Sequence, residues 1–497
     1  MTTAAADSGR SQEDIAALAK GGRTNFFGFL LRLVARIPFL FIASRLYGAA
    51  AMGRFASALV MVEFAGMLAT MGQKRGLAAR LAEESEHPAN VVADALLLAT
   101  LVSAPAMVLL YLFPEAMYPK GNFSQTDVLL AAAVWLLALG DLALAALAYR
   151  FDVATTVRAR AVVEPWALSL SAGALYFVLP ESGLSLAYLI SVGAATGVAL
   201  VALARAYGAP RGWLPRPGYL LRIAQRNLPL AGADAVEWGT RKLDVFILRF
   251  FVGEAPLGIY FFAQQFASLP QKLKTSFEPV LGPVITRNVR EENYGAIARQ
   301  VCQVGFWITA AQAGIALALM IPGTGLMGLG GPDFVKGTGA LGFLLVAEVV
   351  AATAVVSEAA LVYLARYQNF VLSLVTIALQ AALTVGGLEL ARAMGYGDGW
   401  RIAAAAAALM VSLATASVLK SRLLSRLLDQ PINNFRKALA WAVIPALAVG
   451  LVARAVLPEW AEIALGIPAI LGVYVWMIWN KGFGPEDRVL FRKEVGG

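Results

Sequence analysis

The chain has 497 residues, of which 59% are hydrophobic and 15% are charged, and its formal net charge at pH 7 is +9. Because soluble globular proteins carry about 25% charged residues, this composition excludes a water-soluble fold for most of the chain. Cys302 is the only thiol and His87 the only imidazole. An intramolecular disulfide is therefore excluded, and we expect no metal site, no cofactor and no catalytic residues.

Long apolar runs follow one another along the chain and predict an all-α integral membrane protein. A helix that crosses a hydrocarbon core about 30 Å thick needs about 20 apolar residues. About fourteen such spans fit the sequence, at residues 25–47, 53–73, 91–113, 128–149, 162–180, 184–206, 223–252, 257–285, 300–321, 338–364, 369–391, 401–420, 436–456 and 460–480. The outer connectors are too short to build a catalytic domain outside the membrane.

The basic residues are distributed unevenly between the two sides of the predicted spans. The connectors on one side, together with both termini, hold 27 of the 41 Lys and Arg residues, whereas the opposite connectors hold about seven. The positive-inside rule assigns the basic side to the cytoplasm, so both termini are predicted to be cytoplasmic. The excess positive charge therefore reports topology, and we expect no binding to nucleic acid.

Two stretches 205 residues apart resemble each other. Gly48 corresponds to Gly253, Gly53 to Gly258, and Phe55 to Tyr260. Each stretch has the pattern of a helix end, a tight glycine turn and a second helix that starts on a glycine and an aromatic residue. Six helices per unit is an even number, so the repeat predicts two parallel lobes related by an axis along the membrane normal, a design that commonly encloses a site with alternating access. The alternative is a hairpin turn that arose twice.

The repeat and the basic connectors predict how the chain is divided. The longest basic connector, residues 207–222, contains three prolines and separates six helices from eight. We predict a cytoplasmic N-terminal segment at 1–24, a six-helix lobe at 25–206, a basic linker at 207–222, a second six-helix lobe at 223–420, two additional transmembrane helices at 421–480 and a cytoplasmic tail at 481–497.

Several basic residues lie inside the predicted spans. A Lys or Arg at the centre of a transmembrane helix costs about 2.5–3.5 kcal/mol on insertion scales, so such residues normally face a bundle interior or a wet cavity. Arg32 and Arg36 share one helix face, and no carboxylate accompanies them in the first span, which favours an anion as their partner. Guanidinium groups bind phosphate oxygens in pairs, so phosphate or pyrophosphate fits best. The predicted anion-binding residues of this central cavity are Arg32, Arg36, Arg241, Lys242, Lys272 and Lys274.

Pairing among the charges themselves is the alternative to an anion site. Glu237 and Arg241, for example, are one helical turn apart. Carboxylates inside spans also raise a second hypothesis, that some of them carry protons or bind Na⁺ for coupling, although each could equally be a hydrogen-bonded structural acid. The candidate coupling acids are Asp141, Asp234, Glu237 and Glu348, and Glu63 and Glu389 also lie within spans.

The two glycine-turn stretches also carry a family resemblance. They read Ser44-Arg45-Leu46-Tyr47-Gly48 with Met52-Gly53-Arg54-Phe55, and Asp244-Val245-Phe246-Ile247-Leu248 with Gly253 and Leu257-Gly258-Ile259-Tyr260. They resemble Wzx-type polysaccharide flippases, a branch of the exporter superfamily that also holds multidrug extruders and lipid II flippases. The span count, the cytoplasmic termini, the central basic connector and the two extra C-terminal helices match the same branch.

The resemblance implies a carrier rather than an enzyme. Its substrate would be an undecaprenyl-pyrophosphate-linked oligosaccharide, moved from the inner to the outer leaflet of the cytoplasmic (inner) membrane for polysaccharide biosynthesis. Its partners would be this lipid-linked oligosaccharide, membrane lipids, and a polysaccharide polymerase or other proteins of the pathway.

Three other functions compete with this one. A multidrug extruder for cationic compounds should have an acid-rich cavity, which the arginines of the first span argue against. A polymerase or ligase of the same pathway is expected to need a large outer loop with catalytic residues, which the predicted spans do not leave room for. A lipid II flippase fits the sequence as well, so this alternative stays open.

Overall fold

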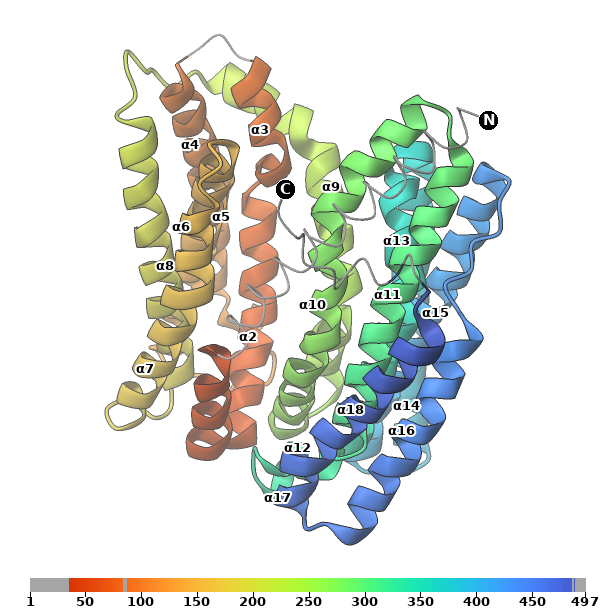
Figure 1. The fold of residues 1–497 in the computed structure, drawn as a ribbon. Helices are drawn as coiled ribbons and strands as arrows, with labels where there is room; N and C mark the ends of the chain where they lie inside the picture. The colour runs from red at the N-terminus through yellow and green to blue at the C-terminus, as the bar shows by residue number, and fades with distance from the viewer. Residues whose placement is uncertain (1–34, 84–86, 485–486, 488–497) are drawn as a thin grey trace. The chain divides into compact units, whose positions relative to one another are not determined.

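The computed structural model describes residues 35–83, 87–484 and 487, and for residues 272–284 it describes the backbone alone. Every regular element within these residues is a helix, which confirms the predicted all-α class (Figure 1). The chain forms two compact units, one ending at Phe261 and the other beginning at Phe262. The boundary lies inside a single long helix, α10 (Glu254–Arg290).

The first unit is a helical bundle, coloured from red to yellow-green in Figure 1. The helical segment that starts at Ala35 ends in the π-helical turn η1 (Ala43–Tyr47), after which Gly48 adopts a φ of +83°. The elements that follow are α2 (Gly48–Ala69), α3 (Gln73–Glu83), α4 (Pro88–Leu112), η2 (Pro114–Ala116), η3 (Asp127–Ala132), α5 (Ala133–Tyr149), α6 (Val153–Val157), η4 (Arg158–Val163), α7 (Glu164–Tyr176), α8 (Gly183–Tyr207), α9 (Pro217–Phe251) and the start of α10. Helix α2 packs against α4, α5, α8 and α9.

The second unit contains the rest of α10 and all later helices, coloured green to blue in Figure 1. Its elements are α11 (Tyr294–Met320), α12 (Gly323–Gly328), η5 (Pro332–Gly337), α13 (Thr338–Leu364), α14 (Arg366–Ala393), α15 (Asp398–Leu428), α16 (Lys437–Val456), α17 (Glu459–Ala461), η6 (Glu462–Gly466), α18 (Ile467–Met477) and η7 (Ile478–Gly482). Its core lies along α11, where Phe306 and Trp307 are buried against residues of the last helices.

Ten helical segments within the described residues are long and apolar enough to cross a membrane. The first of them, Ala35–Glu83, covers two predicted spans, and the other nine each cover one. Helices also lie at the predicted spans 162–180, 223–252 and 257–285 but are not among the ten. Helix α7 has only 13 residues because η4 precedes it, whereas α9 and α10 carry several charged residues. That fourteen helices cross the membrane therefore remains a prediction.

Helix α14 turns its polar face inward, the reverse of a helix on a water-soluble protein. Its buried residues include Asn369, Ser373, Thr376, Gln380 and Thr384, which recur every three or four positions. Its exposed residues include Leu374, Val375 and Val385. Exposed apolar surface of this kind is unfavourable in water but not in lipid, where polar groups are instead satisfied between helices. The pattern supports a membrane environment for this unit.

The repeat glycines Gly53 and Gly258 lie against each other where α2 crosses the start of α10. A Cβ atom on Gly53 would lie 1.8 Å from the carbonyl oxygen of Glu254, and one on Gly258 would lie 1.9 Å from that of Ala49. Ala49 and Glu254 are also 205 residues apart. The contact of Gly53 with Glu254 is therefore matched by the contact of Gly258 with Ala49 at the equivalent positions of the repeat, as expected across a two-fold axis. The neighbouring turns are less alike, because Gly48 has a positive φ whereas Gly253 does not.

This crossing tolerates no side chain. We predict that Gly53→Ala and Gly258→Ala each lower the free energy of unfolding by about 1–3 kcal/mol, because the added methyl group would displace a helix backbone. Thermal unfolding of the purified protein in detergent measures the change. Gly197→Ala in α8 is the matched control, since its Cβ meets open space, and it should leave the melting temperature unchanged or raise it. Equal effects of all three substitutions would contradict the assignment.

The Asp487 carboxylate accepts hydrogen bonds from several parts of the second unit. Asp487 accepts hydrogen bonds from Arg436 (2.6 Å), Trp307 Nε1 (2.8 Å) and Gln303 Nε2 (3.2 Å), and also from the Gly484 amide. The Arg436 guanidinium in turn lies 3.9 Å from the centre of the Phe306 ring. Burial opposes ionisation of Asp487, but these donors outweigh it and hold the pKa of the carboxyl below its ordinary value. The carboxylate thus joins α11 to the α15–α16 connector.

Stability should depend on the charge of Asp487. We predict that Asp487→Asn lowers the free energy of unfolding by about 2 kcal/mol at pH 7, because hydrogen bonds to a charged group are lost. Since the folded-state pKa lies below the unfolded value of about 3.9, this contribution is complete above about pH 5 and is lost as the pH falls through the folded pKa. Unfolding measured from pH 7 to pH 3 should show the difference from wild type shrinking. Asp333→Asn, which removes an exposed ion pair with Lys336, should cost far less. A deficit for Asp487→Asn that is as large at pH 3 as at pH 7 would contradict the prediction.

Candidate functional site

Charged side chains form three groups of ion pairs within the first unit. The acids are Glu63, Asp141, Glu164, Asp234 and Glu237, and the bases are Arg36, Lys74, Arg75, Arg160, Arg241 and Lys242. They come from α2, α3, α5, η4, α7 and α9 and from the segment before η1. Among the described residues, bases exceed acids in these groups by one.

The first group is a chain of alternating charges. Glu164 on α7 lies 3.5 Å from Arg36 and 2.8 Å from Arg160, which is one helical turn before it. Arg160 also pairs with Asp141 on α5, and Asp141 lies 3.5 Å from Lys74 on α3. Arg160 therefore lies between two carboxylates, each of which holds a second base.

The second group is centred on Glu237 of α9. Arg75 on α3 donates from Nε to Asp234 and from Nη2 to Glu237, both at 2.6 Å. The other carboxylate oxygen of Glu237 lies 2.9 Å from Arg241. The third group is a single pair, Lys242 with Glu63 on α2, at 3.7 Å.

In four of these pairs the carboxylate is clearly less exposed than its base, and the difference is largest for Glu164 with Arg36 and for Asp234 with Arg75. The Glu164 side chain is 10% exposed and that of Arg36 is 49% exposed. Asp234 is likewise 10% exposed, against 45% for Arg75. Charged groups in a membrane protein avoid lipid and face a protein interior or water. The accessible side of the two pairs is therefore formed mainly by guanidinium groups, which suits the binding of an anion.

The structure brings together six of the residues that the sequence predicted. Arg36, Arg241 and Lys242 lie in these groups with Asp141, Asp234 and Glu237. Glu348 is buried on α13 of the second unit. Arg32 and the side chains of Lys272 and Lys274 lie outside the described residues.

The expectation that Arg36 lacks a carboxylate partner is wrong, because Glu164 supplies one from another helix. The pairing of Glu237 with Arg241 is confirmed. Lys74, Arg75 and Arg160 are among the 27 basic residues of the predicted cytoplasmic side, which were attributed to topology, and Glu164 is not among the predicted site residues. Of these residues, only Arg160 and Glu164 could have been paired from the sequence, because their i, i+4 spacing places them on one helix face.

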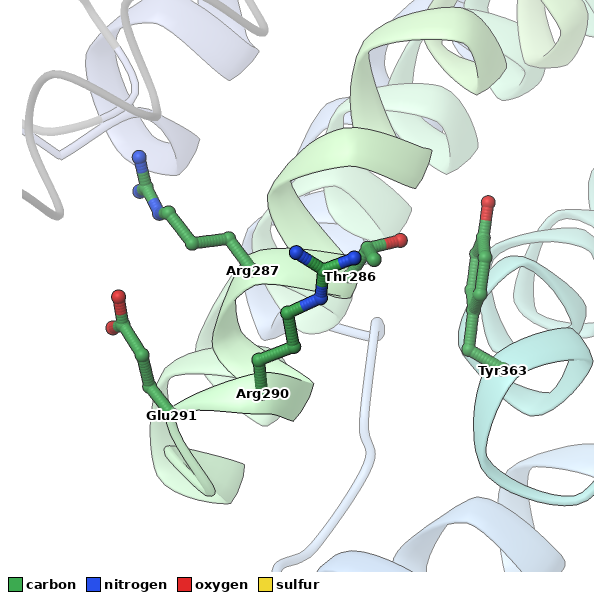
Figure 2. Close-up of a pocket in the computed structure, with 5 residues that line it drawn as sticks. All are labelled: Thr286, Arg287, Arg290, Glu291 and Tyr363. Carbon is green, nitrogen blue, oxygen red and sulfur yellow. The ribbon is translucent and has the colours of Figure 1, made fainter. Parts of the chain in front are cut away.

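A pocket of about 530 Å³ lies at the end of α10 in the second unit. It is lined by Thr286, Arg287 and Arg290 of α10, by Glu291 directly after this helix, and by Tyr363 of α13. Figure 2 shows Arg290 extending beside Thr286 toward the Tyr363 side, whereas Arg287 and Glu291 point to the opposite side of α10. Its charged lining consists of two arginines and one glutamate.

A family model described as polysaccharide biosynthesis protein matches residues 24–289, more than half of the chain. The chain belongs to this polysaccharide biosynthesis family. Comparison with curated protein sequences gives no significant match. The match covers every residue of the three ion-pair groups.

Solved structures with the same fold are membrane transporters. The lipid II flippase MurJ in an inward closed conformation has a TM-score of 0.71 at 12% identity and covers 91% of this chain and 97% of its own. A multidrug resistance transporter of the MATE family and the MOP superfamily, facing inward, has a TM-score of 0.61 at 13% identity and covers 80% and 98%. A MOP superfamily transporter from Pyrococcus furiosus, described as having a binding pocket of reverse polarity, has a TM-score of 0.58 at 14% identity and covers 84% and 96%. The family member described here is thus a multi-pass membrane protein with the MOP superfamily fold.

The Glu164–Arg160 pair should be energetically coupled. We predict that Glu164→Gln lowers the free energy of unfolding by about 1–3 kcal/mol, because Arg160 and Arg36 lose a buried charged acceptor. In a double-mutant cycle with Arg160→Gln, the coupling energy from thermal unfolding should reach about 0.5–3 kcal/mol. The exposed pair Glu83–Arg226 is the control and should give at most about 1 kcal/mol. Additive effects at Glu164 and Arg160 would contradict the pairing.

Proposed function

We propose that this protein is a flippase that moves an undecaprenyl-pyrophosphate-linked oligosaccharide from the inner to the outer leaflet of the cytoplasmic membrane. Membership of the polysaccharide biosynthesis family supports this substrate class. The fold shared with a lipid II flippase and with drug transporters supports a carrier with alternating access. The distribution of basic residues supports cytoplasmic termini.

The observation that carries the proposal is the guanidinium surface of the first unit. Arg36 and Arg75 are about half exposed, and the carboxylates Glu164 and Asp234 lie behind them. A diphosphate offers several charged oxygens, and guanidinium groups bind such oxygens through paired hydrogen bonds. The buried carboxylates keep these bases neutralised when no substrate is present, which limits the cost of holding them in a membrane protein.

The lobes and the coupling acids belong to the same proposal. Two six-helix lobes, at 25–206 and 223–420, followed by two additional helices, are supported by the reciprocal contact of Gly53 and Gly258.

Three candidate coupling acids, Asp141, Asp234 and Glu237, already pair with bases. Glu348 belongs to the other unit.

A lipid II flippase shares the diphosphate and fits the same guanidinium surface. A multidrug extruder for cationic compounds fits it less well, because a cation would meet Arg36 and Arg75 before their carboxylates. Transport of a labelled lipid-linked oligosaccharide, lipid II and a cationic dye by the same reconstituted protein separates the three functions.

Loss of the protein should trap the substrate on the cytoplasmic side. We predict that deleting the gene makes lipid-linked oligosaccharide accumulate in the cytoplasmic leaflet, and that Arg36→Ala or Arg241→Ala reproduces this at normal protein level. Export should fall about tenfold for each, as expected when a charge-assisted contact is lost. Arg392→Ala, at an exposed pair with Glu389, is the control and should export normally. Normal export by both single variants and by their double would overturn the proposal.

A further inference from the structure

Glu237 occupies a position between two guanidinium groups. Its Oε2 atom lies 2.6 Å from Arg75 and its Oε1 atom lies 2.9 Å from Arg241. Arg75 comes from α3 and Arg241 from α9, so a single carboxylate bridges bases of two helices. Arg75 and Glu237 are each nearly half exposed, and Arg241 is about one third exposed. The bridge is therefore accessible to a competing anion.

Asp234 is a second carboxylate that binds Arg75, and it is more deeply buried than Glu237. It accepts from Arg75 Nε at 2.6 Å and is itself buried. Arg75 Nη2 is the atom that binds Glu237. Removal of Glu237 would therefore free one edge of the guanidinium while Asp234 still holds the other in place. Lys242, the next base on α9, pairs with Glu63 instead and stands outside this bridge.

The backbone sets the position of Arg75. Helix α2 ends at Ala69, and Met71 and Gly72 adopt positive φ values of 50° and 68° before α3 begins. Gly72 packs directly on α9, because a Cβ atom there would lie 2.5 Å from the backbone nitrogen of Ala231. Such values of φ are uncommon for a residue with a side chain, so the break at Met71 is a defined feature of the chain. Arg75, one turn further on, is thus presented to α9 before any ligand arrives.

We propose that Arg75 is a further residue that binds the diphosphate of the substrate, and that Glu237 is an internal anion that the diphosphate displaces from Arg75 and Arg241. The inference rests on the proposed function, which supplies the diphosphate. A diphosphate has two charged groups and can pair with both guanidiniums at once, whereas Glu237 offers one charge to be shared between them. The carboxylate holds the two bases together at rest and leaves when the substrate binds.

Displacement predicts that removing the competitor strengthens binding. We measure binding of inorganic pyrophosphate and of farnesyl pyrophosphate to the full-length protein in nanodiscs by calorimetry, with farnesol as the uncharged comparison. Glu237→Gln should tighten binding of both pyrophosphates about three- to tenfold, because the ligand no longer has to break an exposed ion pair before it binds. Arg75→Gln should weaken binding about tenfold, and farnesol should respond to neither substitution. Unchanged or weaker pyrophosphate binding by Glu237→Gln would overturn the inference.

Two controls separate displacement from a general change in charge. Glu63→Gln removes the same charge from the same unit but releases only Lys242, so it should tighten binding much less than Glu237→Gln. Glu83→Gln breaks a different α3–α9 ion pair, with Arg226 at 2.7 Å, and should leave binding unchanged. Equal tightening by Glu63→Gln and Glu237→Gln would contradict displacement.

The test also distinguishes this inference from the proposed function. If the wild-type protein binds neither pyrophosphate and Arg36→Ala changes nothing, the proposed function fails. If the wild type binds them through Arg36 and Arg241 but Glu237→Gln does not tighten binding, only the displacement fails. Glu237→Asp is the second variant should Glu237→Gln fold poorly. Its shorter side chain cannot reach both guanidiniums, so it should tighten binding as well, and its failure to do so would count against the inference in the same way.

Discussion

Helices α2 and α10 meet backbone to backbone because neither Gly53 nor Gly258 has a side chain to keep them apart. Close approach of this kind is a common way for helices to associate in lipid, where there is little hydrophobic force between them. Helix α2 also packs against four other long helices of the first unit, and it extends from this crossing to the break at Met71. The crossing and the packing of Gly72 on α9 thus fix the helix at both ends, and the position of Arg75 follows from them.

The electrostatics of the first unit follow from the cost of charge in a membrane. An isolated arginine would be expensive there, so each base of the three groups has a carboxylate within 4 Å. Glu164 and Asp234 are buried whereas Arg36 and Arg75 are about half exposed, so neutralisation does not remove the accessible cationic surface. Glu237 is the most exposed carboxylate of the three groups, and it is as accessible as Arg75. This exposure is why we propose Glu237 as the carboxylate that a diphosphate displaces.

Helix positions could be predicted well from the sequence, since hydropathy depends on local composition. The described helices lie at the predicted spans, and α14 has the polar buried face expected in lipid. The prediction was weakest where local geometry departs from a regular helix, as in η4 before α7, because the π-helical turns of Arg158–Val163 leave no hydropathy signal. Arg160 lies in that stretch, which is one reason its part in the ion-pair groups was missed.

The sequence by itself determined the membrane class, the helix order, the paired glycine turns and the presence of Arg36 and Arg241 within spans, because each of these depends on neighbouring residues or on a fixed offset. Only the tertiary structure decided which charges on different helices meet. Glu164 pairs with Arg36, and Arg75 with Asp234 and Glu237, across more than 120 positions of the chain in each case. Coulomb energy depends on the distance between atoms and on the surrounding dielectric, and neither quantity can be read from separation along the sequence.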